Sequence, residues 1–249
     1  MTAVTVDGLG AVELAARCGV PRAVLLRDVE STLDVAHALA AEGAPSGTLI
    51  VAERQSAGRG RQGREWKSDR GIGVWFTLVE RVDDEALAVL ALRLGLALAP
   101  ALDPFSARPV RLKWPNDLWV GERKLAGVLV EARWRDGQPE WAAIGVGINL
   151  QPPDGEPGAT GLRTGVTRAE VLVAVVPAIR AVVAKTGLLT SDELAEWASR
   201  DLAAAREISE PVAGRVLGID SGGALLVESD GGVTRWRSGS IVFSGPMRE

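Results

Sequence analysis

The stretch Arg54-Gln55-Ser56-Ala57-Gly58-Arg59-Gly60-Arg61-Gln62-Gly63-Arg64-Glu65-Trp66 combines three glycines with four arginines. It follows residues 48–53, an apolar run that ends in an acid and indicates a buried strand. Glycine lets a backbone approach a ligand closely, and arginine offers a permanent positive charge in a planar fork that matches phosphate and carboxylate. The stretch therefore predicts an anion-binding loop. Taken alone, it fits a small anion, the phosphates of a nucleic acid or a solvated loop about equally well.

Composition narrows these alternatives. The chain has 249 residues, is 47% hydrophobic and carries a net charge of -4, whereas a protein that lives on nucleic acid is usually basic. The single cysteine, Cys18, excludes an intramolecular disulfide and is typical of a reducing compartment, so we expect a cytoplasmic protein. The single histidine, His37, excludes histidine-based triads and multi-histidine metal sites. We expect no protein-bound metal.

No targeting or membrane segment is expected. The first residues lack the basic start of a signal peptide. The longest apolar stretch, residues 86–102, is interrupted by Arg93 and Pro100, which favours a buried helix over a membrane span.

Periodicity and turn signals divide the chain into three parts. Residues 1–22 are expected to form an N-terminal extension with one short helix near 11–18. Residues 23–208 are expected to form a large domain, with strands at 23–30, 48–53, 71–80, 110–117, 124–130 and 141–146 and helices at 33–41, 85–99, 168–186 and 192–205. Residues 209–249 contain four short β runs, at 212–219, 224–229, 233–236 and 240–243, which predict a small all-β domain.

Three further segments carry candidate chemistry. Lys113-Trp114-Pro115-Asn116-Asp117 places a lysine at a strand end before a rigid turn, although an exposed lysine beside an ordinary turn has the same pattern. Lys124-Leu125-Ala126-Gly127 starts an apolar run with a charge, which also fits an ordinary strand with a gatekeeper residue. Gly145-Val146-Gly147-Ile148-Asn149 allows a close backbone approach to a ligand, or marks a bulge. Each signal is weak alone.

Together and in this order, the four segments resemble the biotin protein ligases. Ser31-Thr32 also stands where that family has a Ser-Thr pair, and residues 218–226 resemble part of the family's C-terminal barrel. The resemblance implies an α/β fold: a mixed sheet flanked by helices, similar to class II aminoacyl-tRNA synthetases (the biotin/lipoate ligase domain), followed by a small SH3-like β barrel.

The resemblance also implies an activity. The family joins biotin to ATP, which is expected as its Mg²⁺ complex, and forms biotinyl-5′-AMP and pyrophosphate. It then transfers biotin to one lysine of a biotin carboxyl carrier protein, a domain or subunit of acetyl-CoA or acyl-CoA carboxylase. The twenty or so leading residues leave no room for a winged helix, so a monofunctional ligase without a DNA-binding domain is expected.

Site residues carry over from the family's motifs position by position. Lys113 and Arg61 are expected to be catalytic. Biotin is expected to contact Ser31, Thr32, Gln55, Gly58, Arg59, Gly60, Arg61 and Lys124. ATP is expected to contact Arg59, Arg64, Trp66, Lys113, Asn116, Asp117 and Asn149. Residues 49–52 and 128–130 are expected to supply apolar walls, and Asp117 is the nearest group to orient the acceptor amine.

The sequence departs from the family at three places. Leu33 stands where an asparagine is usual, Thr160-Gly161-Leu162 lacks a common serine, and residues 239–242 lack a common acid. Two other functions stay open: a lipoate-type ligase or acyltransferase of the same fold, and a nucleic-acid-binding regulator that responds to biotin. A homodimer is compatible with the sequence, which identifies neither the oligomeric state nor the acceptor subunit.

Overall fold

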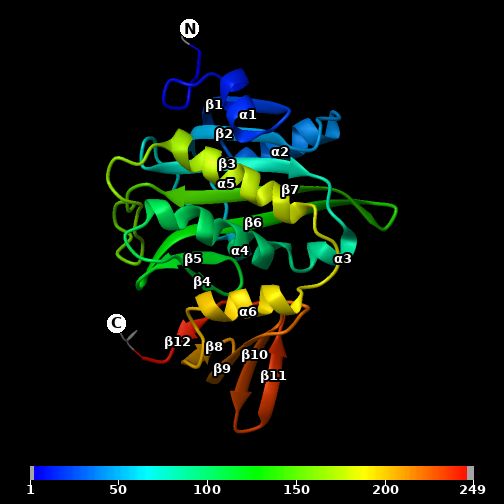
Figure 1. The fold of residues 1–249 in the computed structure, drawn as a ribbon, viewed down its shortest axis with the longest axis vertical. Coiled ribbons are helices and arrows are strands. Elements are labelled where there is room, and N and C mark those ends of the chain that lie inside the picture. Colours follow the sequence, from blue (N-terminus) through cyan, green and yellow to red (C-terminus); the bar gives the residue numbers. More distant parts are fainter. Residues whose placement is uncertain (1–2, 246–249) are drawn as a thin grey trace.

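Two β-sheets organise the chain in a computed structural model that describes residues 3–245 (Figure 1). The larger sheet has seven strands in the spatial order β1-β2-β3-β7-β6-β5-β4. Only β1 and β2 pair in parallel, and the other neighbours are antiparallel, so the sheet is mixed as the sequence predicts. The strands are β1 (Arg22–Val29), β2 (Thr48–Gln55), β3 (Gly73–Glu80), β4 (Arg111–Lys113), β5 (Asp117–Val120), β6 (Arg123–Arg135) and β7 (Gln138–Asn149).

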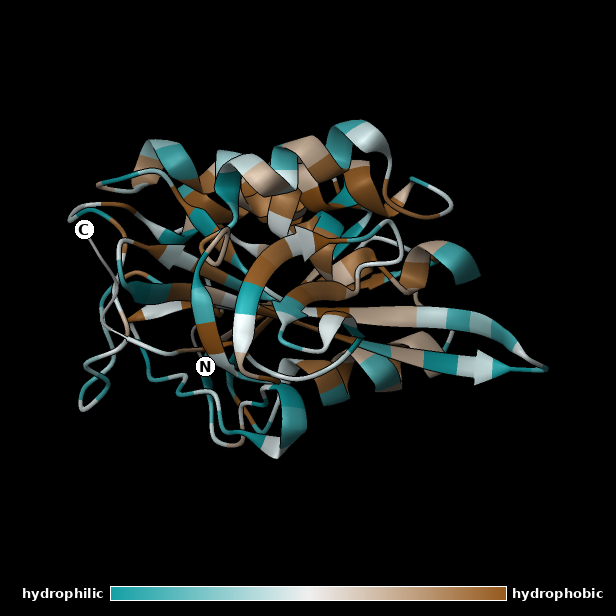
Figure 2. Cartoon of the chain, turned by 90° about the horizontal axis from the view of Figure 1, so that it is seen from below, coloured by the Kyte–Doolittle hydropathy of each residue, from teal (hydrophilic) through white to brown (hydrophobic). Residues whose placement is uncertain are grey.

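Helices cover both faces of this sheet, which confirms the expected fold class (Figure 2). One face packs against α1 (Ala11–Cys18), α4 (Leu90–Leu102) and α5 (Arg168–Val183), and the other packs against α2 (Thr32–Ala41). Side chains of β2 alternate between the two layers, because successive residues of a strand point to opposite faces. Leu49 and Val51 join the larger core, whereas Ile50 joins the α2 side. This explains why residues 48–52 are buried without interruption.

Two predicted helices have different limits in the structure. The helix expected at 85–99 is split into α3 (Asp84–Leu87) and α4, because Val89 leaves the helical region with φ -112° and ψ 3°. The helix expected at 192–205 is α6 (Ser191–Arg200), and Asp201 ends it with an extended backbone. Arg93 of α4 is 1% exposed and pairs with Glu193 of α6 at 3.1 Å. The charge that interrupts the apolar stretch is therefore a buried link between two helices.

The β6–β7 hairpin is longer than predicted. Its two strands continue past the neighbouring strands and project from the body of the molecule (Figures 1 and 2). Asp136 and Gly137 make the turn with φ values of 52° and 78°, the backbone that an Asp-Gly hairpin turn requires. At its other end β7 runs to Asn149, three residues beyond the end of the strand predicted at 141–146.

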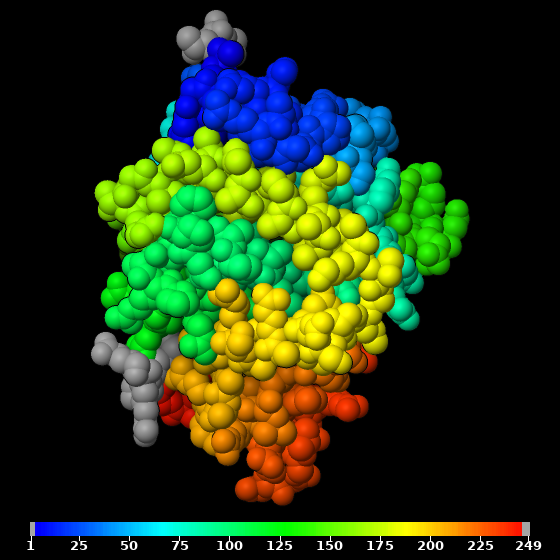
Figure 3. All heavy atoms as spheres, viewed as in Figure 1, coloured from blue at the N-terminus to red at the C-terminus, as the bar shows by residue number. Residues whose placement is uncertain are grey.

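The second sheet contains five antiparallel strands in the order β11-β10-β9-β8-β12 and lies beyond α6 (Figures 1 and 3). Its strands are β8 (Glu207–Glu210), β9 (Gly214–Ile219), β10 (Leu225–Ser229), β11 (Gly232–Trp236) and β12 (Val242–Phe243). The sequence analysis missed β8, which is short and mostly polar. The sheet is joined to the larger domain by Trp114, whose indole N–H donates to the carbonyl oxygen of Gly223 at 3.0 Å. Within residues 3–245, none of the helices has the length and apolar character that a membrane crossing needs.

Candidate active site

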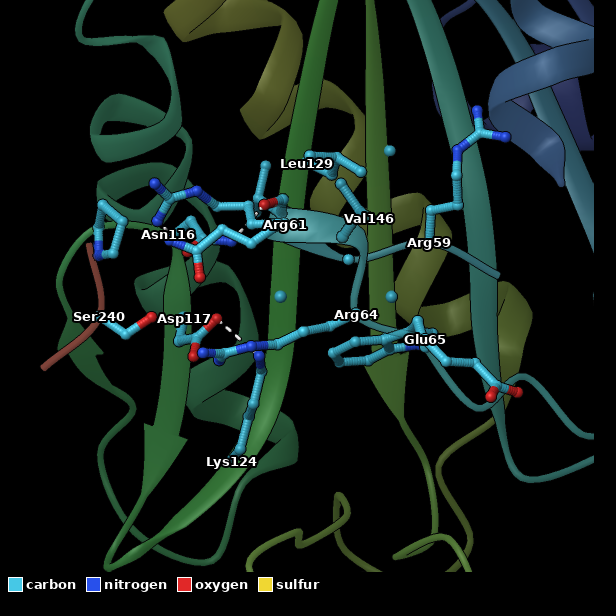
Figure 4. A pocket seen from close by; sticks show the side chains of 18 of the residues that line it. Arg59, Arg61, Arg64, Glu65, Asn116, Asp117, Lys124, Leu129, Val146 and Ser240 are labelled. Atoms are coloured by element: carbon cyan, nitrogen blue, oxygen red, sulfur yellow. Dashed lines mark hydrogen bonds and ion pairs between the residues drawn. The ribbon is translucent and has the colours of Figure 1, made fainter. Parts of the chain in front are cut away.

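A cavity of about 320 Å³ opens where β2, β3, β5, β6 and β7 meet the Gly/Arg loop (Figure 4). Most of the residues predicted from the sequence line this one cavity. They are Ser31, Thr32, Gln55, Arg59, Gly60, Arg61, Arg64, Trp66, Lys113, Asn116, Asp117 and Lys124. These residues lie up to 93 positions apart in the chain. In the sequence they are related only by the order of their motifs, and the fold brings them to one cavity.

One end of the cavity is a network of neutral polar groups. Gln55 Oε1 accepts from the backbone N–H of Thr32 at 2.8 Å and from its hydroxyl at 3.0 Å. Gln55 Nε2 donates to Ser68 Oγ at 2.9 Å. The hydroxyl of Ser31 caps α2 by accepting from the N–H of Leu33 at 3.3 Å. Ser31 and Thr32 are almost fully buried, so this end presents fixed hydrogen-bonding groups with very little water around them.

Glycines on adjacent strands make room for an aromatic wall. A Cβ added to Gly147 of β7 would lie 2.5 Å from the indole nitrogen of Trp66, and one added to Gly127 of β6 would lie 3.0 Å from the same ring. Gly145 likewise leaves room for the side chain of Leu33. The buried indole N–H of Trp66 has no hydrogen-bond partner among the described residues. This nitrogen is packed against the backbone of Gly147, so it is the rest of the ring that forms the wall of the cavity.

The Gly/Arg loop is closed on itself. Gly60 N–H donates to the carbonyl of Arg64 at 2.7 Å, and Gln62 and Gly63 adopt positive φ values of 58° and 72°. Arg61, at the turn of the loop, points toward Asn116 and donates to its Oδ1 at 3.4 Å (Figure 4). Burial lowers the pKa of the Arg61 guanidinium. The loop thereby holds a half-buried cation against the rim of the cavity.

Arg59 points away from this cluster in the structure (Figure 4). Its guanidinium forms two contacts of 2.8 Å with the carboxylate of Asp34 on α2 and a longer contact of 3.5 Å with Glu131 on β6. The hydrogen bond that Arg59 donates to Asp34 is the main cause of the raised pKa of Arg59. Arg59 lines the cavity with the rest of its side chain, but its charged end is held outside.

Two lysines stand at the opposite end from the Gln55 network. Lys124 Nζ pairs with Asp117 Oδ1 at 2.7 Å (Figure 4). Lys113, at the end of β4, makes no ion pair or hydrogen bond within residues 3–245. Burial is the main cause of its lowered pKa, with Asp117 opposing that effect. This end of the cavity concentrates the cations Arg61, Arg64, Lys113 and Lys124. Such a cluster suits a ligand that carries several negative charges.

Two predicted contact residues lie off the cavity wall. Gly58 is packed so closely against Trp66 that an added Cβ would lie 2.4 Å from the Trp66 carbonyl oxygen. Asn149 is buried, and its side chain donates to the carbonyl oxygen of Lys124 at 3.5 Å. Both therefore shape the backbone behind the cavity. Residues 49–52 do not line the cavity either, and Leu49, Ile50 and Val51 pack into the two cores instead. Of residues 128–130, Val128 and Leu129 line the cavity and Val130 does not.

The sequence analysis missed several wall residues. Phe76 is part of a buried strand whose apolar pattern gives no sign of a ligand, whereas Val146 lies within the glycine-containing segment at 145–149. Ser240, Ile241 and Val242 come from the C-terminal sheet and form one side of the cavity. The carbonyl oxygen of the preceding residue, Gly239, accepts from Arg61 at 3.3 Å. No local signal in the sequence indicates this contact, because it joins residues 178 positions apart.

Within the described part of the chain, no group of three or more histidine, cysteine, aspartate or glutamate side chains is arranged to hold a metal ion. The cavity instead combines a neutral polar end, apolar walls and a cationic end. This arrangement fits a small molecule with a polar head, an apolar body and an acid group, next to a polyanion.

Comparisons with known proteins point the same way. Residues 26–149 match the biotin/lipoate A/B protein ligase family, and residues 207–244 match the biotin protein ligase C terminal domain. The chain is 33% identical over 231 residues to the biotin--[acetyl-CoA-carboxylase] ligase of Paracoccus denitrificans, which covers 82% of this chain and 94% of that protein.

The chain is also 35% identical over 213 residues to the bifunctional ligase/repressor BirA of Escherichia coli (strain K12). The aligned region covers 79% of this chain. The matched part is 66% of that protein's length, slightly less than two thirds. Among solved structures, biotin protein ligase from Aquifex aeolicus in complex with biotin and ATP superposes with a TM-score of 0.71 at 28% identity, covering 88% of this chain and 97% of that one.

Proposed function

This chain belongs to the biotin protein ligase family, and from that premise we propose that it joins biotin to ATP and transfers the biotinyl group to a carrier protein. The expected acceptor is one lysine of a biotin carboxyl carrier protein in an acetyl-CoA or acyl-CoA carboxylase. The reaction consumes ATP as its Mg²⁺ complex, and we place it in the cytoplasm. The Paracoccus relative supports a carrier partner, because it is named as a ligase that joins biotin to acetyl-CoA-carboxylase.

One observation carries the proposal: a single cavity joins the Gln55–Thr32 network to the cluster around Lys113. Biotin has a polar ureido ring, an apolar body and a carboxylate, in that order. The Gln55 end suits the ureido ring, and the walls formed by Val128, Leu129 and Trp66 suit the apolar body. A site that hydrogen-bonds a buried polar group rejects analogues without that group, because its own polar atoms are then left unpaired.

In the first step, a carboxylate oxygen of biotin attacks the α-phosphorus of ATP, and pyrophosphate leaves. Two anions must meet, so the barrier falls only if fixed positive charge lies where the negative charge collects. Lys113, Arg61 and Arg64 all line the cationic end of the cavity, which supports this requirement. We assign Lys113 and Arg61 to charge stabilisation, and Arg64, Asn116 and Asp117 to the nucleotide.

Exclusion of water protects the product of this step, because an acyl-phosphate mixed anhydride hydrolyses readily. The Gly/Arg loop and residues 240–242 approach the cavity from two sides and touch each other through Arg61 and Gly239. We assign these two segments to retaining the adenylate. Trp66, which lines the cavity, is proposed to shield the same intermediate from water.

In the second step, the amine of the carrier lysine attacks the acyl carbon, and AMP leaves. Asp117 is the proposed orienting group for that amine. Its ion pair with Lys124 at 2.7 Å holds the carboxylate at the cationic end of the cavity. An incoming ammonium would compete with Lys124 for the same oxygen atoms.

The two alternative functions are less well supported. A lipoate-type ligase shares the larger domain, but residues 207–244 match a domain of biotin protein ligases, and the Gln55 network suits a ureido ring, which lipoate lacks. A nucleic-acid-binding regulator finds support in the repressor function named for relatives such as the Escherichia coli protein, but the net charge of -4 does not favour it.

The test is release of pyrophosphate by the purified protein with ATP and Mg²⁺, in the presence of biotin, lipoate or neither. We expect release that depends on biotin, followed by biotin transfer when a carrier domain is added. Equal release with lipoate, or none with biotin, would contradict the proposal. Sedimentation of the same samples measures whether one or two copies carry the activity.

A further inference from the structure

The ammonium of Lys113 rests against two aromatic rings instead of a carboxylate. Its Nζ lies 4.5 Å from the ring centroid of Trp119 on β5 and 5.2 Å from the ring centroid of Phe243 on β12. Asp117 is the acid closest in sequence, but its carboxylate pairs with Lys124. A cation over an aromatic face is attracted by the negative face of the ring, and more strongly when water is scarce.

These contacts matter because Lys113 is only partly exposed and lies among other cations. Burial lowers the pKa of Lys113 most, and the positive charges of Lys124, Arg64 and Arg206 lower it further. Arg206 itself lies 3.9 Å from the Phe243 ring centroid, so this ring contacts two cations at once. Besides the charge of Asp117, the two rings are the groups found here that favour a charged Lys113.

Trp119 adds a second observation. Its buried indole N–H has no hydrogen-bond partner among the described residues, so the residue bears the cost of an unpaired donor. A phenylalanine would avoid the unpaired donor, but its smaller ring would leave part of this space unfilled and bind a cation more weakly. What tryptophan supplies here is the ring face that meets Lys113, and tryptophan is the strongest cation–π partner among the side chains.

Phe243 reaches Lys113 because of how the C-terminal sheet is seated. β12 pairs with β8, with Phe243 opposite Ile208, which is 1% exposed in the core. Trp114, the residue after Lys113, bonds to Gly223 of the same sheet at 3.0 Å. These contacts hold the small domain beside the end of β4. Phe243 therefore contacts Lys113, although the two residues are 130 positions apart in the chain.

We propose that Phe243 and Trp119 are positioning residues that hold the ammonium of Lys113 charged and aimed at the reacting phosphate. The C-terminal sheet then contributes to the first chemical step through a ring, and not only by closing the cavity. This inference rests on the proposed function of Lys113 in adenylate formation.

The test replaces Phe243 with phenylalanine analogues that carry one, two and three ring fluorines. Fluorine weakens the negative face of the ring stepwise and changes its size very little. We expect the kcat of biotin-dependent ATP–pyrophosphate exchange to fall stepwise across the series. With Phe243→Leu, which removes the ring and keeps apolar bulk, the loss should be about 2- to 30-fold. Biotin affinity by calorimetry and Tm should stay at the parent values.

A pH profile separates positioning from packing. A ring that stabilises the ammonium raises the pKa of Lys113, so a weaker ring lowers that pKa. The alkaline decline of kcat should therefore move to lower pH as fluorines are added. The other charged groups around Lys113 stay the same in every variant, so they do not account for a stepwise shift of the alkaline limit of kcat. These groups are Asp117, Lys124, Arg64 and Arg206.

Two controls make the outcome decisive. The same analogues at Phe105, which packs against the core and does not line the cavity, should leave exchange unchanged. In a Lys113→Ala background the analogues at Phe243 should have no further effect. Equal rates across the Phe243 series, or a stepwise loss that persists without Lys113, would overturn the inference while the proposed function stands. A parent protein without biotin-dependent exchange would instead remove the proposed function itself.

Discussion

Lys113 is the residue on which the proposed chemistry depends most. Replacing it with alanine removes the cation nearest to the proposed reaction and leaves the Gln55 end intact. We expect adenylate formation to slow by about 10²- to 10³-fold, the loss typical of one preorganised electrostatic donor. Biotin binding should change little. Pyrophosphate release and calorimetry measure the two effects, and Lys67→Ala is the matched control, because Lys67 lies outside the cavity lining. Near-normal pyrophosphate release from the Lys113 variant would refute the assignment.

Gln55 gives a second prediction at the level of single residues. Its Oε1 is the acceptor for both donors of Thr32, which is 3% exposed. Gln55→Leu leaves these donors unpaired, so the free energy of unfolding should fall by about 1–3 kcal/mol. Gln55→Glu keeps the acceptor and should lose less. Urea denaturation measures the difference, and equal losses for the two variants would show that the Thr32 bonds contribute nothing.

The Gly/Arg loop is the element proposed to cover the cavity and retain the adenylate. Arg61 links its turn to Asn116 and to Gly239 of the C-terminal sheet. Arg61→Gly removes both links and adds backbone freedom, so we expect biotinyl-5′-AMP to dissociate faster. Filtration of enzyme loaded with labelled adenylate measures this release. A variant that retains the adenylate as long as the parent would contradict the proposed lid.

The link between α4 and α6 gives a prediction about acid stability. Burial tends to raise the pKa of Glu193, but hydrogen bonds from Arg93, Lys185 and Thr190 outweigh it and lower the pKa from 4.5 to about 2. A carboxylate with a depressed folded-state pKa stabilises the fold above its unfolded pKa, and this stability is lost as pH falls toward the folded value.

Glu193→Gln removes that stabilisation at neutral pH. The difference in the free energy of unfolding between the parent and Glu193→Gln should therefore be largest above about pH 5 and shrink between 4.5 and about 2. Urea titrations at several pH values give the curve. Glu196→Gln on the same helix is the control, and a difference that is independent of pH would refute the assignment to Glu193.

At the level of elements, the sequence predicts most strands and helices but not all their limits. Alternating and continuous apolar runs identified six of the seven strands of the large sheet. The strand predicted at 110–117 covers β4 and the turn after it, but it ends where β5 begins. The helix at 85–99 was predicted in one piece because its composition is apolar throughout, and a backbone break at a buried valine leaves no compositional mark. The hairpin turn at Asp136-Gly137 did carry a signal, and reading it would have extended both strands.

The whole molecule should respond to its ligands as one unit, since both domains line the cavity. A ligand that binds only the folded state, at about 100 times its Kd, stabilises that state by about 2.7 kcal/mol. For a chain of this length, that corresponds to a Tm increase of about 5–10 °C. Biotin with ATP and Mg²⁺ should raise Tm more than the two ligands do separately, because the adenylate fills both parts of the cavity. Lipoate is the control, and an equal increase with lipoate would contradict the proposed specificity.

The amino-acid sequence by itself determined the chemistry that the site contains: a Gly/Arg loop after a buried strand, a lysine at a strand end, and polar groups at Ser31, Thr32 and Gln55. These are local patterns, and residue type and spacing suffice to recognise them. The tertiary structure alone decided where the charged ends point. Arg59 turns outward to Asp34 and Glu131, Lys113 rests on Trp119 and Phe243, and residues 240–242 complete the cavity. Such contacts depend on how distant segments pack, because the direction of a long side chain follows from its neighbours in space and not from those in the sequence.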